Sequence, residues 1–245
     1  MTTIAEQSED EILSILKKTD GGRVLDIATG GGMFAGFLAE HLRSVGEVTG
    51  LDMHEPPAES SDSVFNNDGF TYCRGDAHSL DFTDDTFDTV AICNSLHHLN
   101  DHELVLREML RVLRPGGLFV LMEMVRDEQT DAQMTHVRVH HWAAGIDMVA
   151  GVSHHETMTR VELLNRVANM RLSQTSMYYQ EPEGDPLDPD TLTQMEAQID
   201  AIAGRGTGII PDDQLLREAS EIRSHLHRSG FHLATEAFIA GRKPS

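Results

Sequence analysis

Apolar residues in the first half of the chain fall into short continuous runs, with stretches of helical spacing between them. Five runs are typical of buried strands, at residues 23–28, 47–52, 70–74, 87–94 and 118–125. Helices are expected between strands, because apolar side chains such as Phe34, Leu38 and Leu42 recur four positions apart. Strands that alternate with helices predict right-handed crossovers and a mainly parallel α/β sheet, with ligands at the carboxyl ends of the strands.

The remaining segments predict further helices and a closing strand. Residues 4–18 are typical of an amphipathic helix. Beyond residue 125 we expect consecutive helices over 127–170, a strand over 172–180, two helices over 192–203 and 212–228, and a last strand over 232–241. We therefore predict one domain over 1–245, with a core of about 21–125 and 229–245 and a helical cap or insertion of about 127–228.

Net charge and hydropathy exclude several kinds of partner. The chain carries 40 acidic against 19 basic residues, a formal charge of -21, which would repel a phosphate backbone. The longest apolar run, 118–125, is interrupted by Glu123 and is too short to span a bilayer. Residues 1–20 have neither the basic nor the apolar region of a secretion signal. We expect a cytoplasmic protein with no nucleic-acid or membrane partner.

A glycine-rich turn follows the first predicted core strand. Gly30, Gly31 and Gly32 stand between strand and helix, where backbone amides and the positive helix end favour an anionic ligand group. Gly30, Gly32 and Ala35 also satisfy the dinucleotide pattern G-x-G-x-x-A, and Asp52 lies twenty residues past Gly32, as a ribose-binding acid would. The turn by itself leaves a nicotinamide-dependent oxidoreductase open.

Asp26 places a carboxylate four residues ahead of the first glycine of this turn. A carboxylate there suits a bound ammonium better than a pyrophosphate, which it would repel. The competing interpretation is that Asp26 only accepts hydrogen bonds from the amides of the turn. A ligand that carries both a cation and a carboxylate fits the first interpretation.

Six segments in order resemble the motifs of class I S-adenosylmethionine-dependent methyltransferases. They are VLDIATGGG at 24–32, VTGLDM at 48–53, GDA at 75–77, FDTV at 87–90, LHHL at 96–99 and LRPGG at 113–117. The resemblance covers about residues 23–123 and is greatest to the small-molecule group that includes the quinone-biosynthesis C-methyltransferases. It implies a Rossmann-like, doubly wound, mostly parallel sheet of seven strands, the last antiparallel, with a helical cap.

The resemblance also implies S-adenosylmethionine as cofactor and a role for each matching residue. The methionyl end would be held by Asp26 and the loop of Ala28, Thr29, Gly30 and Gly32; Asp52 would bind the ribose, Met53 the adenine face and Asp76 the adenine amino group, with Ala77, Asn94 and Ser95 also lining the cofactor. The chain departs from the commoner glycine pattern at Ala28 and Thr29. Taken singly, Asp76 could instead cap a turn and Met53 could fill the core.

Several of the 14 histidines of the chain cluster in two segments, 97–98 and 136–155, near where the substrate is expected to lie. His97 and His98 follow the fourth strand, where they serve either catalysis or packing. Further along come His136, His140, His141, Trp142, Asp147, His154, His155 and Glu156. These side chains could be solvated or helix-capping, could form a substrate pocket with one histidine as base, or could bind a metal with Asp147 or Glu156.

The substrate pocket is our working hypothesis, and no metal is expected. The candidate catalytic residues are His98 and His141, and the candidate substrate-binding residues are His97, His140, Trp142 and His155.

Methyl transfer from a sulfonium is an in-line displacement that depends mostly on alignment and desolvation, so few catalytic groups are obligatory. We expect an enzyme that methylates a small molecule, with a homodimer possible. The alternatives are a cofactor-binding protein without transferase activity and the nicotinamide-dependent oxidoreductase. The sequence does not identify the acceptor.

Overall fold

The predicted strands assemble into one sheet in the computed structural model, which describes residues 4–55 and 64–245. The sheet order is β1-β7-β8-β6-β5-β2-β3-β4. The strands are β1 (Ala5–Glu6), β2 (Asp20–Ile27), β3 (Ser44–Asp52), β4 (Phe70–Arg74), β5 (Phe87–Cys93), β6 (Leu113–Met124), β7 (Ser173–Gln180) and β8 (Glu236–Arg242).

Strand directions confirm the predicted fold class. Parallel pairs join β2 with β3 and β5, β3 with β4, and β5 with β6, whereas β8 is antiparallel to both β6 and β7. The molecule is thus a Rossmann-like, doubly wound α/β fold with seven long strands. The last of them along the chain, β8, is antiparallel to its neighbours. The two-residue β1 is an eighth strand, parallel to β7.

The N-terminal helix starts later than the sequence predicts. Helix α1 (Glu9–Lys18) begins after Ser8, whose side chain and that of Glu11 form a reciprocal capping box. The residues before this cap pair with β7 instead, so the predicted start at Ile4 is wrong.

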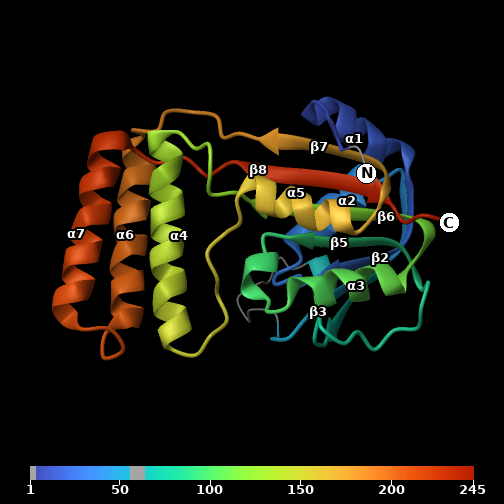
Figure 1. Cartoon of the computed structure of the whole chain (residues 1–245), viewed down its shortest axis with the longest axis horizontal. Coiled ribbons are helices and arrows are strands. Elements are labelled where there is room, and N and C mark those ends of the chain that lie inside the picture. The colour runs from blue at the N-terminus through green and yellow to red at the C-terminus, as the bar shows by residue number, and fades with distance from the viewer. Residues whose placement is uncertain (1–3, 56–63) are drawn as a thin grey trace.

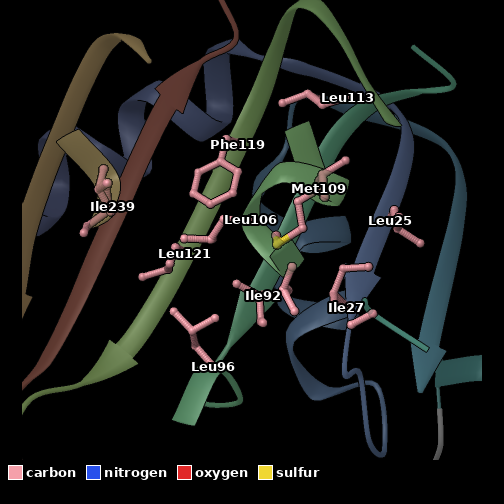
Figure 2. Close-up of a cluster of buried hydrophobic side chains, with 14 of the residues drawn as sticks. Leu25, Ile27, Ile92, Leu96, Leu106, Met109, Leu113, Phe119, Leu121 and Ile239 are labelled. Atoms are coloured by element: carbon pink, nitrogen blue, oxygen red, sulfur yellow. The ribbon is translucent and has the colours of Figure 1, made fainter. Parts of the chain in front are cut away.

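Helices cover both faces of the sheet. Helices α1 and α2 (Met33–His41) lie over one face, and α3 (His102–Val112) and α5 (Arg160–Asn169) over the other (Figure 1). Neighbouring strand residues alternate between the two cores: Val24 packs under α1 and α2, and Leu25 packs on the α3 side (Figure 2). Burial on both faces explains why the strands are continuous apolar runs rather than alternating patterns.

Three long helices stand beside each other at one end of the sheet (Figure 1). They are α4 (Asp131–Val149), α6 (Pro189–Gly206) and α7 (Asp212–Ser229), and they share a separate apolar core that includes Ile146, Ile199 and Leu226. The segment predicted as a cap is therefore divided, because β7 pairs with β8 in the sheet and α5 packs on the sheet face. Among the described helices, none is both long and apolar enough to cross a membrane.

Candidate functional site

The turn after β2 has a backbone that few residue types adopt. Gly30 and Gly32 have φ of 52° and 85°, and Ala28 also lies in the left-handed region, with φ of 52°. Of the described residues, none places an atom within 4 Å of where a Cβ on Gly30 would lie. The turn therefore leaves open space above its backbone, and Ala28 carries strain that a glycine would not.

Asp26 lies beneath this turn rather than on its surface. The Asp26 side chain is buried, and Thr29 Oγ1 donates to its Oδ2 at 2.5 Å. Within the described part of the chain, Asp26 Oδ1 is buried with no hydrogen-bond partner. Desolvation raises the Asp26 pKa to about 7, although the hydrogen bonds from Thr29 and the backbone of Ala35 lower it.

Asp52 faces the turn from the carboxyl end of β3. Its two carboxylate oxygens accept from the backbone amides of Gly30 and His54, each at 3.0 Å. Each oxygen keeps a lone pair that can accept from a ligand hydroxyl. The Met53 side chain beside it is 48% exposed, which argues against a core-filling role.

Asp76 is engaged by its own turn. Its Oδ1 accepts from the His78 backbone amide at 2.9 Å and contacts His78 Nδ1 at 2.7 Å. These bonds to His78 lower the Asp76 pKa, so the carboxylate stays ionised. This geometry matches the turn-capping alternative for Asp76. Ala77 and His78, rather than Asp76, line the cavity described below.

Asn94 joins the ends of three strands. The backbone amide of Met124 donates to Asn94 Oδ1 at 2.9 Å, and Asn94 Nδ2 donates to Glu236. Ser95 Oγ donates to the carbonyl of Cys93 at 2.8 Å. Asn94 adopts φ of 44°, which turns the chain sharply at the end of β5.

These strand ends surround a cavity of about 670 Å³. Among the sequence-predicted cofactor residues, it is lined by Ala28, Gly30, Asp52, Met53, Ala77, Asn94 and Ser95. Lining residues that sequence reasoning missed are Leu51, His54, Gly75, His78, Leu99, Asn100, Gly151, Val152 and Ser153. His54 and His78 directly follow predicted residues, which is a usable signal, whereas residues 151–153 arrive from a distant loop.

A second cavity of about 390 Å³ adjoins the first, since His98 and Val152 line both. Its other lining residues come mostly from α4 and α6: His136, Val139, His140, Ala143, Asp147, His154, Gln198, Ile202 and Arg205. A ligand in either cavity would therefore be in reach of the His98 side chain.

Four imidazoles meet near this boundary. His97 and His98 lie in the 3-10 turn η2 (Leu96–His98), His140 on α4, and His154 on the connection to α5. One ring nitrogen from each lies within 4.8 Å of the others. Partial desolvation within the cluster and the neighbouring imidazoles lower the pKa of His98 to about 4 and of His140 to about 2, so both are neutral at pH 7.

The remaining predicted substrate-site residues lie apart from this cluster. His141 Nε2 contacts Thr157 Oγ1 at 3.1 Å, and burial lowers the His141 pKa. Trp142 packs in the core shared by the three long helices and donates from Nε1 to Glu218 at 2.8 Å. His155 Nε2 contacts Asn100 Oδ1 at 2.9 Å, beside a separate cavity. The sequence-predicted pocket thus brings together His97, His98 and His140, with His154 added.

Comparisons with known proteins match part of the chain to methyltransferases. Residues 25–121 match a family model described as a methyltransferase domain. The demethylmenaquinone methyltransferase of Bacillus subtilis (strain 168) is 34% identical over 122 residues, which cover 49% of this chain and 52% of the relative. The chain spans about half the length of the curated relatives it matches.

Solved structures match over nearly the whole chain. A candidate methyltransferase from Bacillus halodurans C-125 has a TM-score of 0.65 at 20% identity, covering 98% of this chain and 100% of that one. A phosphoethanolamine N-methyltransferase 2 from Haemonchus contortus, in complex with S-adenosyl-L-methionine, has a TM-score of 0.53 at 17% identity, covering 100% and 54%. At these identities the likeness shows the fold.

Proposed function

We propose that this protein transfers a methyl group from S-adenosylmethionine to a small-molecule acceptor, because residues 25–121 match a family model described as a methyltransferase domain. The observation that carries the proposal is the meeting of Gly30, Asp52 and Asn94 around one cavity at the carboxyl ends of β2, β3 and β5. In a parallel α/β sheet this edge is where ligands bind.

The residues present fit the parts of the cofactor. Asp52 keeps acceptor capacity for two vicinal hydroxyls, and open space lies over Gly30. The unpartnered Oδ1 of Asp26 is an acceptor for an ammonium at the methionyl end, once the turn admits one. A buried acceptor without a partner is costly, so a ligand that satisfies it would bind more tightly.

The acceptor is proposed to bind in the second cavity, with His98 beside the reacting methyl group. When bound, S-adenosylmethionine would supply an electrophilic methyl group for the acceptor atom, and its sulfur would keep the electron pair of the broken C–S bond as a neutral thioether; a proton on the acceptor atom would leave to water. His98 is neutral at pH 7 because its pKa is about 4, so it can accept a hydrogen bond from an acceptor but is a weak base. Alignment in the two adjoining cavities supplies most of the rate.

The surroundings favour particular acceptors. The formal charge of -21 favours a neutral or cationic small molecule over an anionic one, and it disfavours nucleic acid. We also propose that the protein acts in the cytoplasm.

Isothermal calorimetry tests the cofactor, and mass spectrometry of labelled products tests transfer. We expect S-adenosylmethionine to bind and nicotinamide dinucleotides not to bind. Asp52→Asn should weaken binding by about tenfold or more, because it removes a charged acceptor worth roughly 1.5–3 kcal/mol. Asp68→Asn is the matched control, since this exposed carboxylate precedes β4 at the opposite end of the strands.

Incubation with cell extract and methyl-labelled cofactor should yield S-adenosylhomocysteine and a labelled small molecule. Binding without product from any acceptor would favour the cofactor-binding protein without transferase activity. Binding of a nicotinamide dinucleotide in preference to S-adenosylmethionine would overturn the proposal.

A further inference from the structure

The imidazoles of His97, His98, His140 and His154 converge from three separate parts of the chain. One ring nitrogen of each lies within 4.8 Å of the other three, and the Nε2 atoms of His140 and His154 are 3.3 Å apart. With Zn–N bonds of 2.0–2.1 Å, two nitrogens of a tetrahedral zinc site are about 3.3 Å apart. The His140–His154 pair already has that spacing, and the wider pairs, which are up to 4.8 Å apart, need to close by up to about 1.5 Å.

The outer ring nitrogens of two of these histidines are held by acidic side chains. His97 Nδ1 lies 2.5 Å from Glu123 Oε1, and His154 Nδ1 lies 2.8 Å from Asp147 Oδ2. A carboxylate at Nδ1 keeps the proton there and leaves the lone pair on Nε2, the atom that would bind a metal. Both pairs thus have the carboxylate–histidine arrangement that typically orients metal ligands.

Packing alone does not explain the presence of an acidic side chain at Glu123. It is fully buried in a strand whose neighbours are apolar, and its other oxygen accepts from the Leu96 backbone amide at 3.0 Å. Both of its bonds go to η2, which carries His97 and His98. A buried carboxylate costs free energy that an apolar side chain would not. This cost indicates that the interaction of Glu123 with His97 has a role beyond packing.

His140 is left with an unmatched nitrogen. Its Nδ1 is buried and, among the described residues, has no hydrogen-bond partner. If His140 Nε2 donated to His154, this Nδ1 would be a buried lone pair without a donor. If the His140 proton is on Nδ1 instead, the Nε2 lone pairs of His140 and His154 face each other at 3.3 Å, and a metal ion shared by both would satisfy them.

We propose that His97, His98, His140 and His154 bind one divalent transition metal ion of the zinc type. Imidazole nitrogens suit zinc, cobalt and nickel, and four neutral nitrogen ligands, two of them with a carboxylate on the other ring nitrogen, make a complete four-coordinate site. This assigns a metal where the sequence led us to expect none. The sequence suggested Asp147 as a possible ligand, whereas the structure makes it the partner of His154.

The position of the site indicates what the ion would hold. His98 is exposed and lines both cavities, so the ion would lie between the proposed cofactor and acceptor cavities. Resting on the proposed function, we infer an acceptor that presents an oxygen donor, such as a phenol or an enolisable carbonyl, in place of the exposed His98 ligand. The metal would stabilise the oxyanion, whose proton leaves to water before the acceptor attacks the methyl carbon.

Cobalt absorption tests the metal site without any assay of activity. After chelation and dialysis, the protein should bind about one Co²⁺ per chain with the intense visible bands of a tetrahedral nitrogen site, and Zn²⁺ should displace it. His140→Gln and His154→Gln should each weaken Co²⁺ binding by about tenfold or more, and Glu123→Gln should do so through His97. His155→Gln, next to His154, and His227→Gln, on exposed α7, should leave it unchanged.

Circular dichroism and S-adenosylmethionine calorimetry on each variant distinguish the loss of a metal-binding side chain from unfolding of the protein. His98→Gln gives a second test of Co²⁺ binding. Because the His98 side chain is exposed, its substitution leaves no cavity in the protein core. Wild-type protein that binds no stoichiometric Co²⁺, or ligand variants that bind it as tightly as the controls, would overturn the proposal. So would a weakening that appears only in variants that have unfolded.

Acetohydroxamate, a small bidentate oxygen ligand, tests whether an oxygen donor can replace His98 on the metal. We expect it to shift the Co²⁺ spectrum of the wild-type protein, and an unchanged spectrum would overturn the inferred oxygen-bearing acceptor. The outcomes also distinguish the two proposals. S-adenosylmethionine binding without metal binding removes only the metal site, whereas metal binding without S-adenosylmethionine binding removes the proposed function.

Discussion

Asp26 should make the folded protein less stable as pH rises. Burial raises the pKa of its carboxyl from the ordinary value of 3.8 to about 7. A carboxyl with a raised pKa holds its proton in the folded state, so its contribution to stability is fully present below pH 3.8 and is lost as pH rises to about 7. The shift of roughly 3 pKa units corresponds to about 4 kcal/mol between these limits.

Asp26→Asn isolates this contribution, since asparagine is close to the protonated carboxyl in shape and cannot ionise. At pH 8 we expect the variant to be more stable than the wild type, by up to about 4 kcal/mol, with the difference vanishing near pH 4. Urea unfolding at a series of pH values measures it, and Asp68→Asn is the control for removal of one negative charge. The difference in free energy of unfolding between the variant and the wild type cancels the contribution of the histidines, which is common to both proteins. That contribution has the opposite pH dependence, because the histidine pKa values are lowered.

The same variant should bind S-adenosylmethionine about tenfold or more weakly, because the proposed ammonium partner loses its charge. A stability difference that stays constant between pH 4 and 8 would refute the reasoning on burial. Unchanged affinity would leave Asp26 as a support of the turn alone.

Three further substitutions test the turn and the histidine assignments. Ala28→Gly should raise the free energy of unfolding by about 1 kcal/mol, since φ of 52° strains alanine; a lower midpoint in thermal unfolding would contradict this. Gly32→Ala should destabilise by about 1–3 kcal/mol, because φ is 85° and its Cβ would lie 2.5 Å from Val64 Cγ2; equal urea midpoints would count against it. His141→Gln should reduce turnover of an identified acceptor less than His98→Gln does, because His98 lines both cavities; steady-state kinetics showing the reverse order would restore His141 as the catalytic candidate.

The sheet and its ligand edge could be predicted because each core strand is apolar on both faces. Asp52 and Asn94 stand where those runs end, and chain order alone brings them to one edge. How deeply an acidic side chain is buried is harder to predict. Asp26 and Asp76 both lie near the carboxyl ends of their strands, yet the Asp26 side chain is buried beneath the turn and that of Asp76 bonds to His78.

The histidine site could be predicted only in part, because its members are far apart in sequence. Helical spacing groups His136 with His140, and adjacency groups His140 with Trp142, but the indole turns into the core of the three helices. His154 meets His97 through the path of the loop between α4 and α5, which periodicity does not encode. Glu123 was the available signal, as the one charge within an otherwise apolar strand run.

A crystal structure with S-adenosylhomocysteine tests the central claim most directly. The account predicts ribose hydroxyls on Asp52, the adenine beside Met53 and Ala77, and the sulfur directed toward His98 at the boundary of the two cavities. A nucleoside bound elsewhere, or this cavity empty in a crystal grown with saturating ligand, would contradict it.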